Sequence, residues 1–190
     1  MTALGILGVL VLVLANAFFV VAEYALVTAP RASVKELADG GHRGAQVALT
    51  LMDDPVRFIG TVQVGITALG IALGALGEPV FREIFDPLVA AWISFAFAFA
   101  IITYLTVVIG ELVPKALALH RAAPIAAAVA RPIALLQRIT GPLVWIFQRS
   151  AQVLLKPLGV PPAPAGATVH TVDELRGIVA EAEDSGLIEE

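Results

Sequence analysis

The sequence contains no cysteine, which excludes disulfides and thiolate metal sites. Charged residues are also scarce: they make up 15% of the 190 residues, against roughly 25% in an ordinary soluble domain. The three histidines, His42, His120 and His170, are too far apart for zinc-type spacing, and no P-loop, dinucleotide fingerprint or nucleophile elbow is present. These absences indicate that the chain is not an enzyme.

Long apolar runs take the place of the missing charges. Hydrophobic residues make up 58% of the chain and are concentrated in three blocks, at about 4–28, 58–77 and 88–110. A helix needs ~20 apolar residues to cross the hydrocarbon core of a bilayer. The first block lacks the positive start of a signal peptide and is longer than its usual apolar region. We therefore predict an all-α polytopic membrane protein with three transmembrane helices in a core of residues 1–121.

Two further segments are amphipathic and polar enough to lie at the membrane surface. The connector at 30–57 mixes charged and apolar residues and has a break at Gly40-Gly41. Residues 122–157 are apolar but are interrupted by four basic residues, and a central arginine is costly inside a bilayer. We predict two juxtamembrane interfacial helices here, broken near Gly141-Pro142, in place of a fourth span.

The C-terminal segment, 158–190, begins as a proline-rich linker and becomes acidic. Seven of the sixteen acids lie in its last eighteen residues. Thr171 and Glu174 have capping-box spacing, which predicts a short amphipathic cytosolic helix that ends near Gly186. Such a helix needs a partner surface, so we expect a soluble domain to follow it.

The basic residues indicate the orientation of the spans. The connector and the segments after the third block are rich in lysine and arginine, whereas the loop between the second and third blocks contains only Arg82. The positive-inside rule then places the N-terminus outside and the C-terminus in the cytoplasm.

Two acids, Glu23 and Glu111, lie within or at the edge of the predicted spans, where ionisable residues usually mark a pathway. Pro114 has no N–H, so the carbonyl of Gly110 loses its helical donor and becomes available beside the Glu111 carboxylate. Hard cations such as Mg²⁺ and Na⁺ take oxygen ligands of this kind. The alternative is that Glu111 forms an i,i+4 ion pair with Lys115 at the membrane edge.

Other polar residues are candidate ligands with simpler alternatives. Asn16 lies seven residues before Glu23, on the same helix face, and either lines the same cavity or bonds a neighbouring helix. Thr67, with Gly65 beside it, is a candidate in the second span, although threonine hydroxyls more often bond back to their own helix. The same two interpretations, cation ligand or hydrogen bond within the helix, apply to Thr61, Thr103 and Thr106.

Glycines in the second predicted span indicate close helix packing. Gly70 and Gly74 form a small-xxx-small pair, which allows a neighbouring helix backbone to approach. We expect these two residues to act in packing and not in ion binding.

Three motifs occur in order, one at each span: Asn16-Ala-Phe-Phe-Val-Val-Ala-Glu23, Gln63-Val-Gly-Ile-Thr67 and Gly110-Glu-Leu-Val-Pro-Lys115. Together they resemble the transmembrane domain of the CorC/CNNM (hemolysin-C-like) family of magnesium transporters, along essentially the whole chain. The resemblance implies a homodimer in the bacterial inner membrane, with a belt of juxtamembrane helices. It also implies a cytosolic CBS-domain pair after the tail, through which ATP would bind, and no nucleic-acid partner.

The same resemblance implies Mg²⁺ export, coupled to Na⁺ influx, with an ion site formed by Glu111, the Gly110 backbone and polar residues of the first two spans. Many relatives have serine or asparagine near Val20, Ala22 and Ile66, which are apolar here. The alternatives are transport of Na⁺, Co²⁺ or Mn²⁺, a membrane anchor for a regulatory domain, and, least favoured, a hemolysin.

Overall fold

Helices account for nearly all of residues 2–158, the part of the chain that this computed structural model describes, and no strand occurs among them. The elements in chain order are α1 (Thr2–Thr28), α2 (Arg31–Asp39), α3 (Arg43–Met52), α4 (Pro55–Phe85), α5 (Ala91–Val107), the π-helical segment η1 (Val108–Leu112), α6 (Val113–His120), α7 (Ala122–Leu155) and the 3₁₀ turn η2 (Lys156–Leu158). The predicted all-α fold is confirmed. The predicted tail helix at Thr171 lies outside the described residues.

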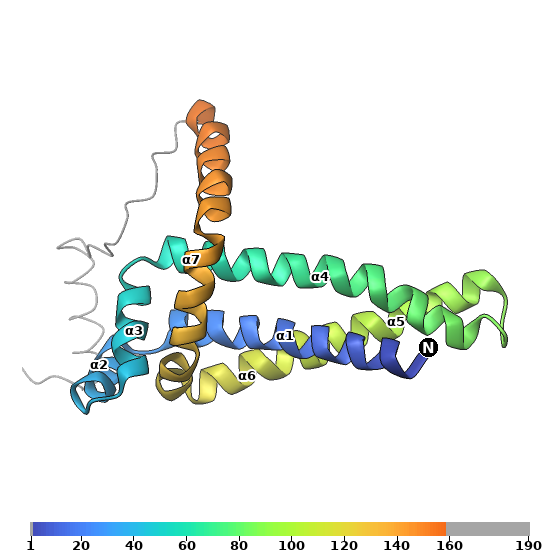
Figure 1. Cartoon of the computed structure of the whole chain (residues 1–190), viewed down its shortest axis with the longest axis horizontal. Helices are drawn as coiled ribbons and strands as arrows, with labels where there is room; N and C mark the ends of the chain where they lie inside the picture. Colours follow the sequence, from blue (N-terminus) through green and yellow to red (C-terminus); the bar gives the residue numbers. More distant parts are fainter. Residues whose placement is uncertain (1, 159–190) are drawn as a thin grey trace, which may run out of the picture.

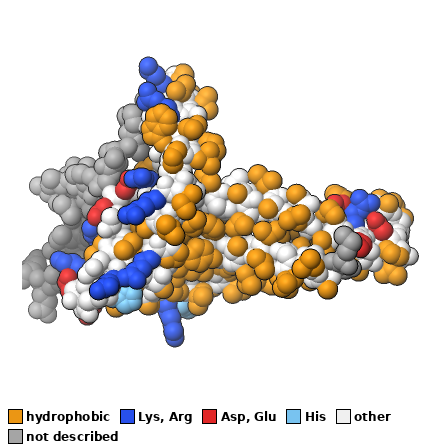
Figure 2. All heavy atoms as spheres, in the orientation of Figure 1, with side chains coloured by type: hydrophobic (Ala, Val, Ile, Leu, Met, Phe, Trp, Pro, Cys, Tyr) orange, Lys and Arg blue, Asp and Glu red, His pale blue; other side chains and the backbone are white. Residues whose placement is uncertain are grey.

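The long helices lie side by side (Figure 1). α1, α4 and the continuous rod of α5, η1 and α6 follow the long axis of the molecule, while α2, α3 and α7 gather at one end. Figure 2 shows that orange hydrophobic side chains cover the surface of this bundle. A patch of this extent is unfavourable in water, but lipid tails cover it in a bilayer. The arrangement is that of a polytopic membrane protein.

Within residues 2–158, four helical stretches, not three, are long and apolar enough to cross a membrane: Ala3–Thr28, Pro55–Phe85, Ala91–His120 and Ala122–Leu158. The additional candidate contains α7, which has the lowest mean hydropathy of the four and runs across the end of the other three in Figure 1. Its direction and its exposed basic residues fit an interfacial helix, which stays a prediction.

The predicted break near Gly141-Pro142 is wrong, because α7 continues from Ala122 to Leu155 with Pro132 and Pro142 inside it. A proline removes one intrahelical hydrogen bond and crowds the carbonyl four residues earlier. For Pro142 that residue is Arg138, which is exposed, so water or headgroups can satisfy its carbonyl. The helix therefore loses one bond without ending.

The turn predicted after residue 77 is also wrong, because α4 continues through Pro79 to Phe85. Arg82 forms i,i+4 ion pairs with Glu78, at 3.3 Å, and with Asp86, at 3.6 Å. These pairs lie along one face and support the last two turns of the helix. The connection to α5 is thereby shortened to residues 86–90.

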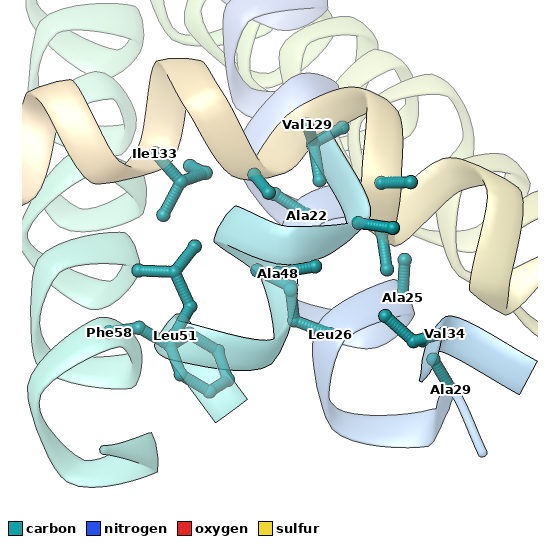
Figure 3. Close-up of a cluster of buried hydrophobic side chains, with 14 of the residues drawn as sticks. Ala22, Ala25, Leu26, Ala29, Val34, Ala48, Leu51, Phe58, Val129 and Ile133 are labelled. Atoms are coloured by element: carbon teal, nitrogen blue, oxygen red, sulfur yellow. The ribbon is translucent and has the colours of Figure 1, made fainter. Parts of the chain in front are cut away.

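The connector forms two helices, α2 and α3, separated at Gly41, whose φ of +89° favours glycine. We call α2, α3 and α7 the juxtamembrane belt. The belt and the adjoining ends of α1 and α4 share one apolar cluster (Figure 3). The cluster consists largely of small side chains, with Leu26, Leu51, Phe58 and Ile133 as its larger members. Small residues let the helices approach closely, as at Gly44, where an added Cβ would collide with the Ala127 carbonyl.

Candidate functional site

The helical rod that begins with α5 contains a local irregularity at η1, where the Gly-Glu pair of the third motif lies. The N–H of Val113 donates to the carbonyl of Val108, one residue further back than in an α-helix. The Gly110 carbonyl that was predicted to lose its donor to Pro114 therefore lies in a π turn within a continuous helix. Pro114 follows in the first turn of α6 and has no N–H to donate to the Gly110 carbonyl.

The carbonyl of Gly110 is met by a side chain from another helix. Asn16 of α1 is buried, and its Nδ2 donates to the Gly110 oxygen at 3.2 Å. A Cβ added at Gly110 would lie 3.1 Å from that Nδ2, so glycine permits the close approach of the two helices. The carbonyl that the sequence predicts to be available thus lies in a buried polar contact, together with one of the predicted ligand residues.

Glu111 forms the ion pair that was the alternative interpretation of this residue. Its Oε2 lies 3.3 Å from Lys115 Nζ, and the two side chains are 40% and 32% exposed. The Lys115 ammonium also lies 5.2 Å from the centre of the Tyr24 ring on α1. Both side chains are partly exposed, so the Glu111 carboxylate is not enclosed by the protein and stays accessible to another cation.

Glu23 occupies the same face of α1 as Asn16, about two turns further along the helix, ~10 Å at 1.5 Å per residue. It is half-buried, and its charge interacts with that of Lys115. No hydrogen-bond partner of its carboxylate is found within residues 2–158. Glu23, Glu111 and Lys115 thus lie where α1 meets η1 and α6, and Lys115 forms its ion pair with Glu111.

Thr67 and Gly65 do not lie near the contact between Asn16 and Gly110. No Cα atom of α4 lies within 8 Å of the η1 segment, and Thr67 is exposed. Gly65 packs against the ring of Phe19 on α1, so closely that a Cβ there would overlap it. Within this chain, Gly65 serves helix packing, and a ligand role for Thr67 stays a prediction.

Gly70 and Gly74 are exposed and would meet no atom within 4 Å if a Cβ were added. The prediction that they pack against a helix is therefore not met inside the described chain, because their face of α4 points away from α1 and α5. A helix that used this face would have to come from outside residues 2–158.

The threonine hydroxyls that form hydrogen bonds here do so with their own helices. Thr106 donates to the Ile102 carbonyl at 2.8 Å, and Thr61 donates to the Arg57 carbonyl at 3.1 Å. This is the alternative that residue type favoured.

Tyr24 and the π turn were not predicted from the sequence. The position of Tyr24 directly after Glu23 was the available signal for the former.

Residues 2–158 contain no group of three or more His, Cys, Asp or Glu side chains that could hold a metal ion. A cation would therefore depend on a mixed set of oxygens: one carboxylate, the Gly110 carbonyl, the Asn16 amide and water. The fold defines the class of the protein, that of α-helical polytopic membrane proteins.

Comparison with known sequences gives the family. The model of the cyclin M transmembrane N-terminal domain (CNNM) matches residues 7–190. UPF0053 protein YhdT of Bacillus subtilis (strain 168) is 35% identical over 187 residues, which cover 94% of this chain and 41% of that protein. UPF0053 protein sll0260 of Synechocystis sp. is 35% identical over 191 residues, with 96% and 42% covered. The chain belongs to the CNNM transmembrane-domain family, as the three motifs predicted.

A third relative has the same relation to the chain. UPF0053 protein YhdP of Bacillus subtilis (strain 168) is 32% identical over 197 residues, with 99% of this chain and 44% of that protein covered. The chain thus spans less than half the length of these curated relatives.

Proposed function

We propose that the chain is the membrane domain of a Mg²⁺ transporter that exports the ion in exchange for Na⁺ and catalyses no covalent reaction. The observation that carries the proposal is the buried contact between Asn16 Nδ2 and the Gly110 carbonyl, directly beside Glu111. Polar groups at this depth in a bundle are expensive, and they are typical of substrate and ion pathways.

The oxygens at this contact suit a hard cation. Mg²⁺ prefers six oxygens at ~2.0–2.1 Å and usually keeps several waters. Binding would require the Asn16 amide to turn, so that its Oδ1 and the Gly110 oxygen face the same space. With Glu111 as a third ligand and water for the rest, the ion would be partly hydrated. This fits a site without an acidic cluster in residues 2–158.

Lys115 would serve as the internal counter-ion of this site. In the structure the Lys115 ammonium forms an ion pair with the Glu111 carboxylate and also lies over the Tyr24 ring. An arriving Mg²⁺ would displace it, and on ion release the lysine would return. The exchange would need the two side chains to separate, and the π turn that contains Glu111, directly before α6, is where the helix could adjust.

The assembly and orientation are also part of the proposal. Basic side chains gather at the belt end in Figure 2, which supports a cytoplasmic position for that end in a bacterial inner membrane. The exposed Gly70 and Gly74 face of α4 supports a homodimer in which a second copy packs there. A CBS-domain pair that binds ATP would account for the remaining length of the relatives.

Two variants separate an ion ligand from a structural ion pair. We expect Glu111→Gln to reduce Mg²⁺ flux into or out of proteoliposomes at least about tenfold. A tenfold reduction corresponds to a rise of ~1.4 kcal/mol in the free-energy barrier to transport. Lys115→Met should retain or tighten Mg²⁺ binding, because it removes the competing cation. Glu83→Gln, an exposed acid at the far end of α4, is the matched control and should transport normally.

If Glu111 serves only to hold Lys115, both variants of the pair will behave alike. Equal loss of stability with unchanged Mg²⁺ binding would contradict the proposal. Wild-type flux in Glu111→Gln would instead favour the membrane-anchor alternative. Competition by Na⁺, Co²⁺ and Mn²⁺ for the purified protein identifies the preferred ion among the remaining alternatives.

A further inference from the structure

The basic residues of α7 and η2 follow a regular spacing. Arg131, Arg138, Arg149 and Lys156 are separated by 7, 11 and 7 residues, and all four are exposed. Intervals of 7 and 11 are close to whole numbers of turns at 3.6 residues per turn, so these residues share one helix face. No acid occurs between residues 112 and 158. The helix therefore presents a stripe of positive charge, and Figure 2 shows Lys and Arg side chains along this end of the molecule.

A second face of α7 is apolar and exposed. Ile139, Leu143, Ile146 and Val153 recur at intervals of 4, 3 and 7 residues, which places them beside the basic stripe. A third face, with Ala126, Ala130, Ile133 and Val144, is buried against the rest of the chain. An amphipathic helix with basic residues at the edge of an exposed apolar face is typical of one that lies in the headgroup region of a membrane.

On the other side of the basic stripe, between it and the buried face, lies a surface pocket of about 280 Å³, lined by Trp145, Gln148, Arg149 and Gln152. Its volume is near the lower end of the roughly 300–1,000 Å³ of small-molecule sites. Gln148 is held in place because its Nε2 donates to the Val56 carbonyl of α4 at 3.2 Å. The pocket thus combines an arginine, which can bind phosphate with two N–H groups, and a tryptophan, which favours the bilayer interface.

We propose that this face of α7 binds the headgroups of anionic phospholipids in the adjoining leaflet, with Arg149 on the phosphate and Trp145 at the acyl boundary. The basic stripe supplies the complementary charge, and the apolar face beside it lies along the acyl chains. The inference does not depend on Mg²⁺ transport, since it uses no residue of the Asn16–Glu111 site. The acidic segment after residue 170 is the other anionic group that could bind the basic stripe. A phospholipid fits better, because its acyl chains would also cover the apolar face beside the stripe.

The two tryptophans of the chain allow a direct test in the intact protein. Trp92→Phe leaves Trp145 as the only tryptophan, and Trp145→Phe leaves Trp92, an exposed residue of α5 at the opposite end of the bundle. Each protein is reconstituted with either dibrominated phosphatidylglycerol or dibrominated phosphatidylcholine at equal mole fraction, and quenching is compared. We expect stronger quenching of Trp145 by the anionic lipid, with a local enrichment of roughly fivefold for each basic residue engaged. Trp92 should show no preference.

Adding Arg149→Gln to the Trp92→Phe protein should reduce the enrichment about fivefold, and raising the salt concentration should reduce it as well. Equal quenching of Trp145 by the two lipids would overturn the proposal, and so would a preference that survives Arg149→Gln with Lys156→Gln. If the preference appears only after the tail acids are neutralised, the tail occupies the stripe and the lipid proposal fails.

Discussion

At the belt end of the molecule, side chains from α1, α2, α3, α4, α6 and α7 form one continuous apolar cluster. Further along the bundle, the second cluster among residues 2–158 is much smaller and has Val9, Val13 and Leu73 as its buried members. The belt cluster contains many alanines, so helices approach closely there and cover each other's apolar faces. The remaining length of the bundle exposes large side chains such as Ile71, Trp92 and Phe99. The chain therefore supplies its own core at the belt, while lipid or a second chain covers the rest.

The largest expected difference between the two regions is in core truncation. Ile133 is 0% exposed in the belt, whereas Ile71 is 69% exposed on α4. We expect Ile133→Ala to lower the free energy of unfolding by about 2–5 kcal/mol, through lost contacts and a cavity. Ile71→Ala should change it by less than about 0.5 kcal/mol, because lipid contacts this residue before and after unfolding. Unfolding titrations in mixed micelles measure both values, and equal losses would remove the distinction.

Two glycines of α4 sharpen the comparison within one helix. Alanine raises helix propensity by about 1 kcal/mol over glycine at either position. At Gly65 the added methyl overlaps the Phe19 ring, and overpacking of this kind costs about 1–3 kcal/mol. Gly70 is open. We therefore expect Gly65→Ala to destabilise the protein by up to about 2 kcal/mol, and Gly70→Ala to stabilise the monomer by up to about 1 kcal/mol, on the same principles.

Gly70→Ala also tests the dimer proposal when association is measured separately, by cross-linking or by single-molecule photobleaching in bilayers. A stabilised monomer with weaker association would support a second copy on this face. Unchanged association with Gly70→Leu, a larger obstacle, would contradict it.

A smaller loss of stability than in the belt core is expected at the buried polar contact. Asn16→Ala removes the donor to the Gly110 carbonyl, and one hydrogen bond contributes about 1 kcal/mol to the free energy of unfolding. Thr103→Ala, an exposed polar residue of α5, should have almost no effect and serves as the control. If Asn16 is also an ion ligand, calorimetry will show weaker Mg²⁺ binding in Asn16→Ala alone. Equal Mg²⁺ affinity in both variants would leave Asn16 a packing residue.

The periodic parts of the fold could be predicted from the sequence, and the positions that depend on a single proline could not. Apolar blocks located α1, α4 and α5, because lipid requires long uncharged helices. The second span was expected to end at residue 77 and the C-terminal helix to break near Pro142, yet α4 continues through Pro79 and α7 through Pro142. A proline removes one hydrogen bond, and the surroundings decide whether the chain turns, forms a π bulge or simply continues.

For the candidate site, the sequence predicted which residues share a face of one helix, but not which residues of different helices meet. The sequence by itself determined the membrane class, the family motifs, the shared face of Asn16 and Glu23, and the missing donor at Pro114. Only the tertiary structure decided that Asn16 meets Gly110, that Lys115 holds Glu111, and that Thr67 lies on another side of the bundle. The physical reason is that helical periodicity orders residues around their own axis, whereas the rotation of each helix toward its neighbours is set by packing contacts between residues far apart in the chain.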